Sequence, residues 1–419
     1  MIGRIAVSAI RTSAVLGLRL VVQAGSLLLV ARLLEPQQFG AFAGVAALAV
    51  LLGTLATFGT HLVLIGEMAK DHARQVQVLA YAIPTTLVCG GILLVAFLSI
   101  CALTLQGNGI GWQVLLAIGI AEMLLQPLSL LAVAKLLALE RTAQSQLLQT
   151  LPLLLRLVAA CAVFALQPGD TLAMYGYGYC IASVIALVVT VVCLPQVWLH
   201  PRQWRRPSVV ELRESASFAV LNITAMGPAE LDKTLAAKLL PPVASGLYAA
   251  GARVVGAVTL PVIALMLSAM PRLFRDGQKQ TQRTARLLRW IFAATTLYSM
   301  VLAATLWWCA PLFVWVLGEK YKGVDEVVRW LCIAVPGMAL RIAAGSALMT
   351  LGKPWMRAGF ELGGIVVLVA AAGMLTVHGN IHAMPLALAC AEWTMAIWGS
   401  FLIIRCIKKP PVFAPYSTK

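Results

Sequence analysis

Five basic residues lie deep inside long apolar stretches of the sequence: Arg19, Arg156, Lys233, Arg253 and Arg341. A charge at such a depth in a membrane is costly, so each side chain is expected to face protein or water rather than lipid. Fixed cations around a water-filled cavity would attract an anion, and guanidinium and ammonium groups bind phosphate well. The sequence therefore predicts a cationic cavity for a passenger that carries phosphate.

Two uncharged polar residues are predicted to line the same cavity. Gln23 shares one helical stripe with four other polar residues, which are Ser8, Thr12, Arg19 and Ser26. Asn222 lies eleven residues before Lys233 and therefore shares its helix face. We expect Arg19, Lys233 and Arg253 to contact the anion. Supporting positions are expected for Arg156, Arg341, Gln23 and Asn222.

Four acidic residues also lie within apolar stretches: Glu122, Glu230, Asp232 and Glu392. They could form permanent ion pairs, which would be Glu122 with Arg156, Asp232 or Glu230 with Arg253, and Glu392 with another cation. They could instead bind a proton or sodium ion with an affinity that differs between two transport states. Both interpretations stay open here. Glu361 is set aside because it lies close to the inner end of its stretch.

Other kinds of chemistry find little support in the sequence. The nine cysteines form no CxxC motif and the five histidines are scattered, so neither a metal site nor a cofactor is expected. No GxxxxGK(S/T) nucleotide-binding motif occurs. The net charge of +16 could indicate nucleic-acid binding, but the cations lie at the ends of apolar stretches rather than in one patch. We expect no enzyme activity.

The elements that must position these residues are membrane helices. Hydrophobic residues make up 61% of the chain and charged residues 11%, which excludes an ordinary soluble protein. About 20 apolar residues suffice to cross a membrane. Twelve such spans are predicted, and the basic N-terminal segment is interpreted as the first of them rather than as a cleaved signal. They cover residues 10–34, 40–61, 77–105, 112–134, 147–167, 171–195, 216–240, 246–270, 288–310, 326–350, 359–378 and 382–406.

The loops between these spans have an uneven distribution of lysine and arginine. Twenty-two cations fall in segments on the side of the N-terminus, including the basic loop 272–289. Four fall on the other side: Arg32, Lys238, Lys320 and Lys322. Because cytoplasmic loops carry the excess of Lys and Arg, both termini are predicted to be cytoplasmic.

One motif occurs twice, 206 residues apart. Residues 31–44 read ARLLEPQQFGAFAG and residues 237–250 read AKLLPPVASGLYAA. In each copy a proline and a glycine (Gly40, Gly246) are interpreted as parts of a tight turn. The repeat predicts two homologous lobes of six helices each, in the same membrane orientation. The expected boundaries are 1–198 for the N-terminal lobe, 199–214 for a cytoplasmic linker and 215–419 for the C-terminal lobe.

This motif and its flanks resemble the Wzx-type polysaccharide flippases of the MOP superfamily. The first outer turn of that family is similar at five positions: Arg32, Leu34, Pro36, Phe39 and Gly40. The second is similar at Asp232, Lys233, Leu240, Pro242, Gly246, Tyr248 and Arg253, with Gly251 in place of an alanine. A Leu-Gly-Lys at residues 351–353 also resembles the family.

The resemblance implies an all-α, MATE-like fold around a central cavity that opens to either side in turn. It implies a monomer of the bacterial inner membrane that carries an undecaprenyl-diphosphate-linked oligosaccharide for O-antigen, capsule or exopolysaccharide, near a polymerase and other assembly proteins. Three alternatives stay open: a MATE-type multidrug/cation antiporter, a peptidoglycan-precursor flippase, and a membrane glycosyltransferase or ligase. The glycan, the pathway and the coupling ion are not predictable from the sequence.

Overall fold

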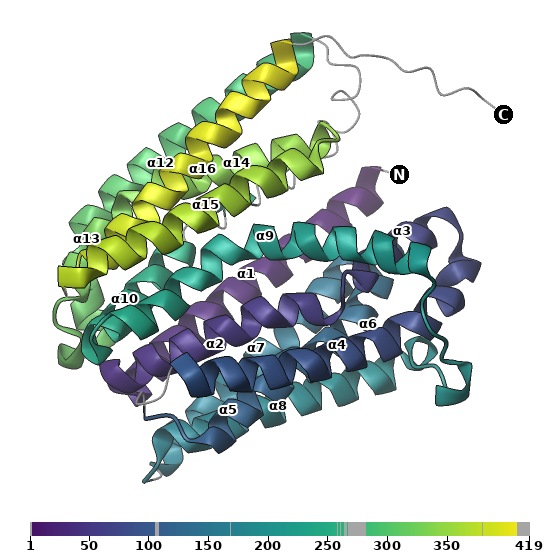
Figure 1. Cartoon of the computed structure of the whole chain (residues 1–419), viewed down its shortest axis with the longest axis horizontal. Helices are drawn as coiled ribbons and strands as arrows, with labels where there is room; N and C mark the ends of the chain where they lie inside the picture. Colours follow the sequence, from purple (N-terminus) through teal and green to yellow (C-terminus); the bar gives the residue numbers. More distant parts are fainter. Residues whose placement is uncertain are drawn as a thin grey trace. The chain divides into compact units, whose positions relative to one another are not determined.

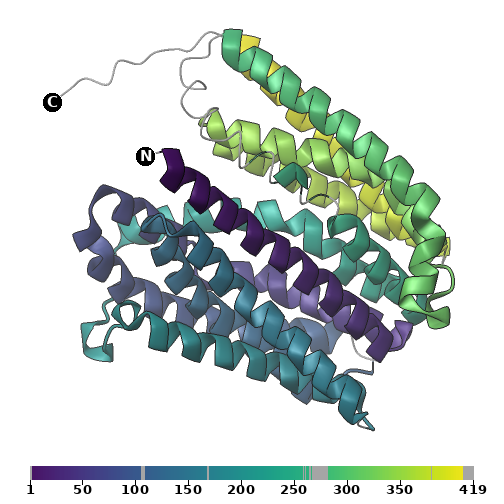
Figure 2. The same ribbon diagram turned by 180° about the vertical axis from the view of Figure 1, so that it is seen from behind.

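The computed structural model describes residues 2–104, 109–167, 169–257, 259, 261–263, 266, 282–378 and 380–408. Within these ranges the chain forms helices and turns and no strand. Figures 1 and 2 show the helices from opposite sides. The first ten longer helices are α1 Ile2–Leu33, α2 Pro36–Ala56, α3 Thr60–Lys70, α4 Gln75–Thr104, α5 Trp112–Ile120, α6 Gln126–Ala138, α7 Thr142–Leu166, α8 Thr171–Cys193, α9 Val209–Leu239 and α10 Pro242–Ala257.

The remaining longer helices are α12 Gln282–Leu317, α13 Val324–Cys332, α14 Ala334–Thr350, α15 Pro354–Leu375 and α16 Ala383–Lys408. A π-helical segment, η2 Ala121–Leu125, joins α5 to α6. Short 3-10 turns complete the described elements: η1 His72–Arg74, η3 Pro195–Val197, η4 Pro201–Gln203, η5 Glu319–Tyr321 and η6 Thr376–His378.

The lengths and composition of these helices confirm a polytopic all-α membrane protein. In the described part of the chain, nine helices are long and apolar enough to cross a membrane, or ten if α13 and α14, bent by 47°, form one span. Helices α1 and α9 are not among them, although their 32 and 31 residues exceed the length a span needs. Both carry charged residues in their apolar stretches. If α13 and α14 count as one span and α1 and α9 are added, the described helices occupy all or part of the twelve predicted spans.

The described helices form two compact units. The first holds Met1–Ala250 and Val314–Lys322, and the second holds Gly251–Phe313 and Gly323–Lys419. Helix α9 belongs to the first unit because it forms with α2 the most extensive helix pair among the described elements. The predicted linker at residues 199–214 separates the two copies of the internal repeat rather than these two units, and it stays a prediction.

The two copies of the repeated motif pack against each other inside the first unit. A Cβ atom on Gly246 would overlap the Pro36 carbonyl group, and one on Gly40 would overlap the Ser245 side chain. Both glycines lie inside helices that begin at Pro36 and Pro242, and neither has a positive φ. Their interpretation as turn residues was therefore wrong. They are small because two helices approach closely there.

A break in the second span was not predicted. Helix α2 ends at Ala56, and Phe58 and Gly59 then adopt positive φ angles of 49° and 77° before α3 begins. By contrast, α9 runs unbroken through Gly227-Pro228, although a proline inside a helix often kinks it. The predicted eighth span and the basic loop 272–289 lie partly outside the described residues, and residues 282–289 of that loop lie on α12.

Candidate functional site

A cluster of charges on α9 surrounds Lys233. The Lys233 ammonium lies 3.2 Å from Glu230 Oε2 and 3.6 Å from Asp232 Oδ1, and it donates a hydrogen bond to the Ala229 carbonyl. The Asp232 side chain is only 4% exposed. It accepts hydrogen bonds of 2.8 Å from its neighbour's backbone N–H and from the Tyr248 hydroxyl of α10. The cluster thus holds two carboxyl groups and one ammonium group.

Close packing against α2 fixes the position of this part of α9. A Cβ atom on Gly44 would overlap the Ala237 side chain, and it would lie 3.2 Å from the Lys233 carbonyl oxygen. Thr234 donates to the Gly44 carbonyl at 3.2 Å. Asn222 Nδ2 lies 3.5 Å from the Thr54 carbonyl oxygen, so this predicted cavity residue contacts the backbone of α2. Arg253, the predicted partner of the α9 acids, belongs to the second unit, and its role stays a prediction.

A second buried cluster joins η2, α7 and α8. Arg156 Nη2 donates to Glu122 Oε1 at 2.7 Å and to Ser183 Oγ at 3.2 Å. The Tyr179 hydroxyl donates to the same Glu122 oxygen at 2.6 Å, and the Arg156 guanidinium stacks 3.5 Å from the Tyr179 ring centroid. The predicted ion pair between Glu122 and Arg156 is confirmed. The π-helical turn that carries Glu122 is of a kind often found at functional sites.

The second unit contains its own buried ion pairs. Arg341 Nε donates to Glu392 Oε2 at 2.7 Å, and the two side chains are 6% and 0% exposed. The cation expected beside Glu392 is therefore Arg341. Arg357 Nε donates to Glu361 Oε1 at 2.9 Å, and the Glu361 side chain is buried, although the sequence placed it near an inner surface.

Arg19 has a different environment from the other predicted cations. It is half-buried where α1 packs against α7, and its Nη1 donates to the side-chain oxygens of Gln149 at 3.2 Å and Gln146 at 3.4 Å. Among the described residues no carboxylate pairs with it. Gln23, one turn further along α1, is exposed. The side chains of Ser8 and Thr12 lie outside the described set.

The predicted site residues thus fall into separate groups. Arg156 and Arg341 each bind a carboxylate, Lys233 contacts two acids on its own helix, and Arg19 contacts amides. Sequence reasoning missed the neutral residues that complete these groups: Gln146, Gln149, Tyr179, Ser183 and Tyr248. Helical spacing offered a signal for four of them, because Gln146 and Gln149 are three residues apart and Tyr179 and Ser183 are four residues apart, so each pair shares one helix face. Tyr248 also occupies the aromatic column of the repeated motif.

Solved structures share this fold at low sequence identity. A multidrug resistance MATE family transporter of the MOP superfamily, inward-facing, matches with a TM-score of 0.76 and 12% identity over 94% of this chain and 96% of that chain. The lipid II flippase MurJ, inward closed, matches with a TM-score of 0.74 and 10% identity over 95% and 89%. A MOP superfamily transporter from Pyrococcus furiosus, described as having a binding pocket of reverse polarity, matches with a TM-score of 0.67 and 12% identity over 98% and 96%.

The sequence itself matches one family. Among curated proteins no relative matches it. The family described as "Polysaccharide biosynthesis protein" matches residues 8–275, which is more than half of the chain. The fold predicted from the resemblance, that of MOP superfamily transporters, is confirmed by the solved structures. The chain belongs to the polysaccharide biosynthesis protein family.

Proposed function

We propose that this protein is a flippase for an undecaprenyl-diphosphate-linked oligosaccharide. It would move one repeat unit of O-antigen, capsule or exopolysaccharide from the cytoplasmic to the periplasmic leaflet of the bacterial inner membrane. The observation that carries the proposal is the family match over residues 8–275. The fold it shares with a lipid II flippase supports a lipid-linked passenger.

The pyrophosphate of such a passenger needs cations that are held in place but not neutralised. Arg19 meets this requirement best, because its described partners are the amide oxygens of Gln146 and Gln149. Arg19, Lys233 and Arg253 would contact the diphosphate in a cavity that opens to each side in turn, with Gln23 and Asn222 beside them. Arg156 and Arg341 would act in support, since each already binds a buried carboxylate.

The direction of transport rests on the membrane orientation. The loops on the side of the N-terminus hold most of the lysines and arginines, whereas the loops on the other side hold four: Arg32, Lys238, Lys320 and Lys322. This distribution favours cytoplasmic termini. Flipping would be driven by an ion gradient, by the membrane potential or by removal of product. The candidate coupling residues are Asp232, Glu230, Glu122 and Glu392. The protein would act as a monomer, near the polymerase that consumes its product.

A MATE-type cation antiporter is the second candidate function. Two observations favour it: the TM-score of 0.76 to a multidrug resistance transporter and the two carboxyl groups around Lys233. Buried carboxylates attract cationic drugs, whereas an arginine such as Arg19, whose described partners are amides, repels them. Arg19 therefore favours the anionic passenger.

A transport assay with three passengers separates the two functions. Purified protein in proteoliposomes would be given a fluorescent undecaprenyl-diphosphate oligosaccharide, the same lipid with one phosphate, and ethidium. The proposal expects the diphosphate to flip fastest, the monophosphate more slowly, and ethidium not at all. Transport of ethidium without transport of either lipid would show that the antiporter is the correct function.

A further inference from the structure

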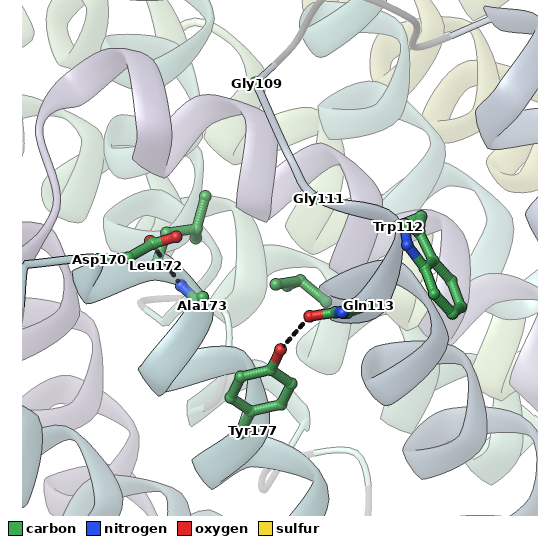
Figure 3. A pocket seen from close by; sticks show the side chains of 9 residues that line it. Gly109, Gly111, Trp112, Gln113, Asp170, Leu172, Ala173 and Tyr177 are labelled. Carbon is green, nitrogen blue, oxygen red and sulfur yellow. Dashed lines mark hydrogen bonds between the residues drawn. The ribbon is translucent and has the colours of Figure 1, made fainter.

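A small polar pocket lies in the first unit, where α5 and α8 begin. Its lining comes from the segment before α5, from the first turn of α5, and from the start of α8: Gly109, Gly111, Trp112, Gln113, Val114, Asp170, Leu172, Ala173 and Tyr177. Figure 3 shows Asp170 and Leu172 on one side, Gln113 on the other, and the Tyr177 hydroxyl directed at Gln113. Its volume is about 260 Å³.

The pocket walls are held by contacts between α5 and α8. The Tyr177 hydroxyl donates a 2.5 Å hydrogen bond to Gln113 Oε1. Val114 follows Gln113 on α5, and Gly176 precedes Tyr177 on α8. A Cβ atom on Gly176 would lie 2.6 Å from Val114 Cγ1, so the two helices are in contact next to the hydrogen-bonded pair. Asp170 Oδ1 accepts from the Ala173 backbone N–H at 3.0 Å and so fixes its own side chain. The pocket is therefore preformed.

Each fixed polar group keeps unused hydrogen-bonding capacity. Gln113 uses its oxygen for Tyr177, which leaves two N–H donors on Nε2 without a partner in the described part of the chain. Asp170 Oδ2 and the lone pairs of the Tyr177 oxygen are likewise open as acceptors among the described residues. The Tyr177 ring stands among these groups, whereas the ring of Trp112, which also lines the pocket, is directed away from Gln113 and Asp170 (Figure 3). Such a mixture suits a ligand with an apolar face and a rim of hydroxyl groups.

We propose that this pocket binds one neutral sugar ring. Asp170 is the only charged residue of its lining, so a phosphate would be repelled. Pockets for larger ligands span roughly 300–1,000 Å³, and a cavity just below this range fits a single ring. The inference rests on the proposed function for its source of sugar, namely the exported glycan. In the predicted orientation, the periplasm faces the C-terminal ends of α4 and α7 and the N-terminal ends of α5 and α8. The pocket would therefore hold the glycan as it emerges.

The test is saturation-transfer NMR on the full chain in detergent, with glucose and N-acetylglucosamine as probes. Ethanolamine is the charged comparison, because it represents a lipid headgroup. Tyr177→Phe removes the hydroxyl that holds Gln113, and Asp170→Asn keeps the helix cap but removes the carboxylate. Each should weaken sugar binding about tenfold. Tyr177→Ala should abolish it, whereas Tyr298→Ala, at a tyrosine of α12 that is 37% exposed against 38% for Tyr177, should leave it unchanged.

The proposal is overturned if neither sugar gives a signal that depends on Tyr177, or if ethanolamine binds instead and depends on Asp170. The flipping assay separates this failure from that of the proposed function. Wild-type protein that flips the diphosphate lipid but shows no sugar signal would contradict only the pocket. Wild-type protein that binds sugar at the pocket but flips no lipid would contradict the proposed function and leave the pocket standing.

Discussion

The two buried charge clusters of the first unit are built on different plans. Glu122 and Arg156 come from different elements, form a one-to-one pair, and are closed in by Tyr179 and Ser183. Lys233 instead meets Glu230 and Asp232, both on its own helix. In the first cluster one acid pairs with one cation, whereas in the second Lys233 contacts two acids. The first is suited to holding three elements together, and we propose that the second accepts a proton or cation.

The largest expected effect comes from breaking the balanced pair. Arg156→Ala leaves Glu122 buried without its cation, which should destabilise the protein by about 3–5 kcal/mol. Thermal unfolding in detergent, followed by size-exclusion chromatography, measures the loss. Lys70→Ala, which breaks the exposed pair with Glu67, is the matched control and should change little. A double variant with Glu122→Gln and Arg156→Met should recover most of the stability. If Arg156→Ala were as stable as Lys70→Ala, the pair would have no structural role.

A smaller effect is expected from crowding the helix pair that positions the α9 cluster. Gly44→Ala adds a Cβ atom that overlaps Ala237, which should cost about 1–3 kcal/mol and shift the backbone beside Lys233. Gly66→Ala in α3 is the control, because nothing lies within 4 Å of a Cβ atom there. Equal unfolding temperatures for the two variants would show that α2 and α9 do not need their close approach.

The two acids beside Lys233 predict which cluster responds to an ion gradient. Asp232→Asn and Glu230→Gln should each reduce the gradient dependence of flipping while leaving most of the stability. Flipping rates in proteoliposomes with imposed proton, sodium and voltage gradients provide the measurement. Glu122→Gln, at the balanced pair, should lower stability but keep the dependence. Full gradient dependence in both α9 variants would exclude these two residues as the coupling site.

The smallest effect is expected at the exposed start of α9, outside the membrane. A hydrogen bond from Arg205, at 2.5 Å, lowers the pKa of Glu211 from 4.5 to about 2, with a further contribution from Ser208. Because the pKa is depressed in the folded protein, the stabilisation is present above pH 4.5 and is lost as the pH falls toward 2. The hydrogen-exchange protection factors of residues 208–213, which correct for the intrinsic pH dependence of exchange, should therefore fall over that interval. Arg205→Ala should move the change toward pH 4.5, and an unchanged profile would contradict the assigned cause.

The sequence predicted the elements of this fold better than their contacts. In the described part of the chain, helices lie in the predicted spans, because the length of an apolar run indicates a span even where charged residues interrupt it, as in α1 and α9. The Glu122–Arg156 pair was also predictable, since few charges lie at that depth. The glycines at 40 and 246 and the break at Phe58-Gly59 were not, because close approach and backbone strain depend on the neighbouring helix. For the same reason, Gly227-Pro228 could not be distinguished from a true break.

The central claim is that fixed cations recognise the diphosphate of a lipid-linked oligosaccharide, and Arg19 tests it most directly. Flipping of the fluorescent undecaprenyl-diphosphate oligosaccharide would be compared for Arg19→Ala, Arg19→Lys, Lys233→Ala, Arg253→Ala and the exposed control Arg213→Ala. We expect Arg19→Ala to reduce the rate at least about tenfold, Arg19→Lys to retain part of it, and Arg213→Ala to match the wild type. Normal flipping by the three alanine variants at positions 19, 233 and 253 would contradict the cationic site.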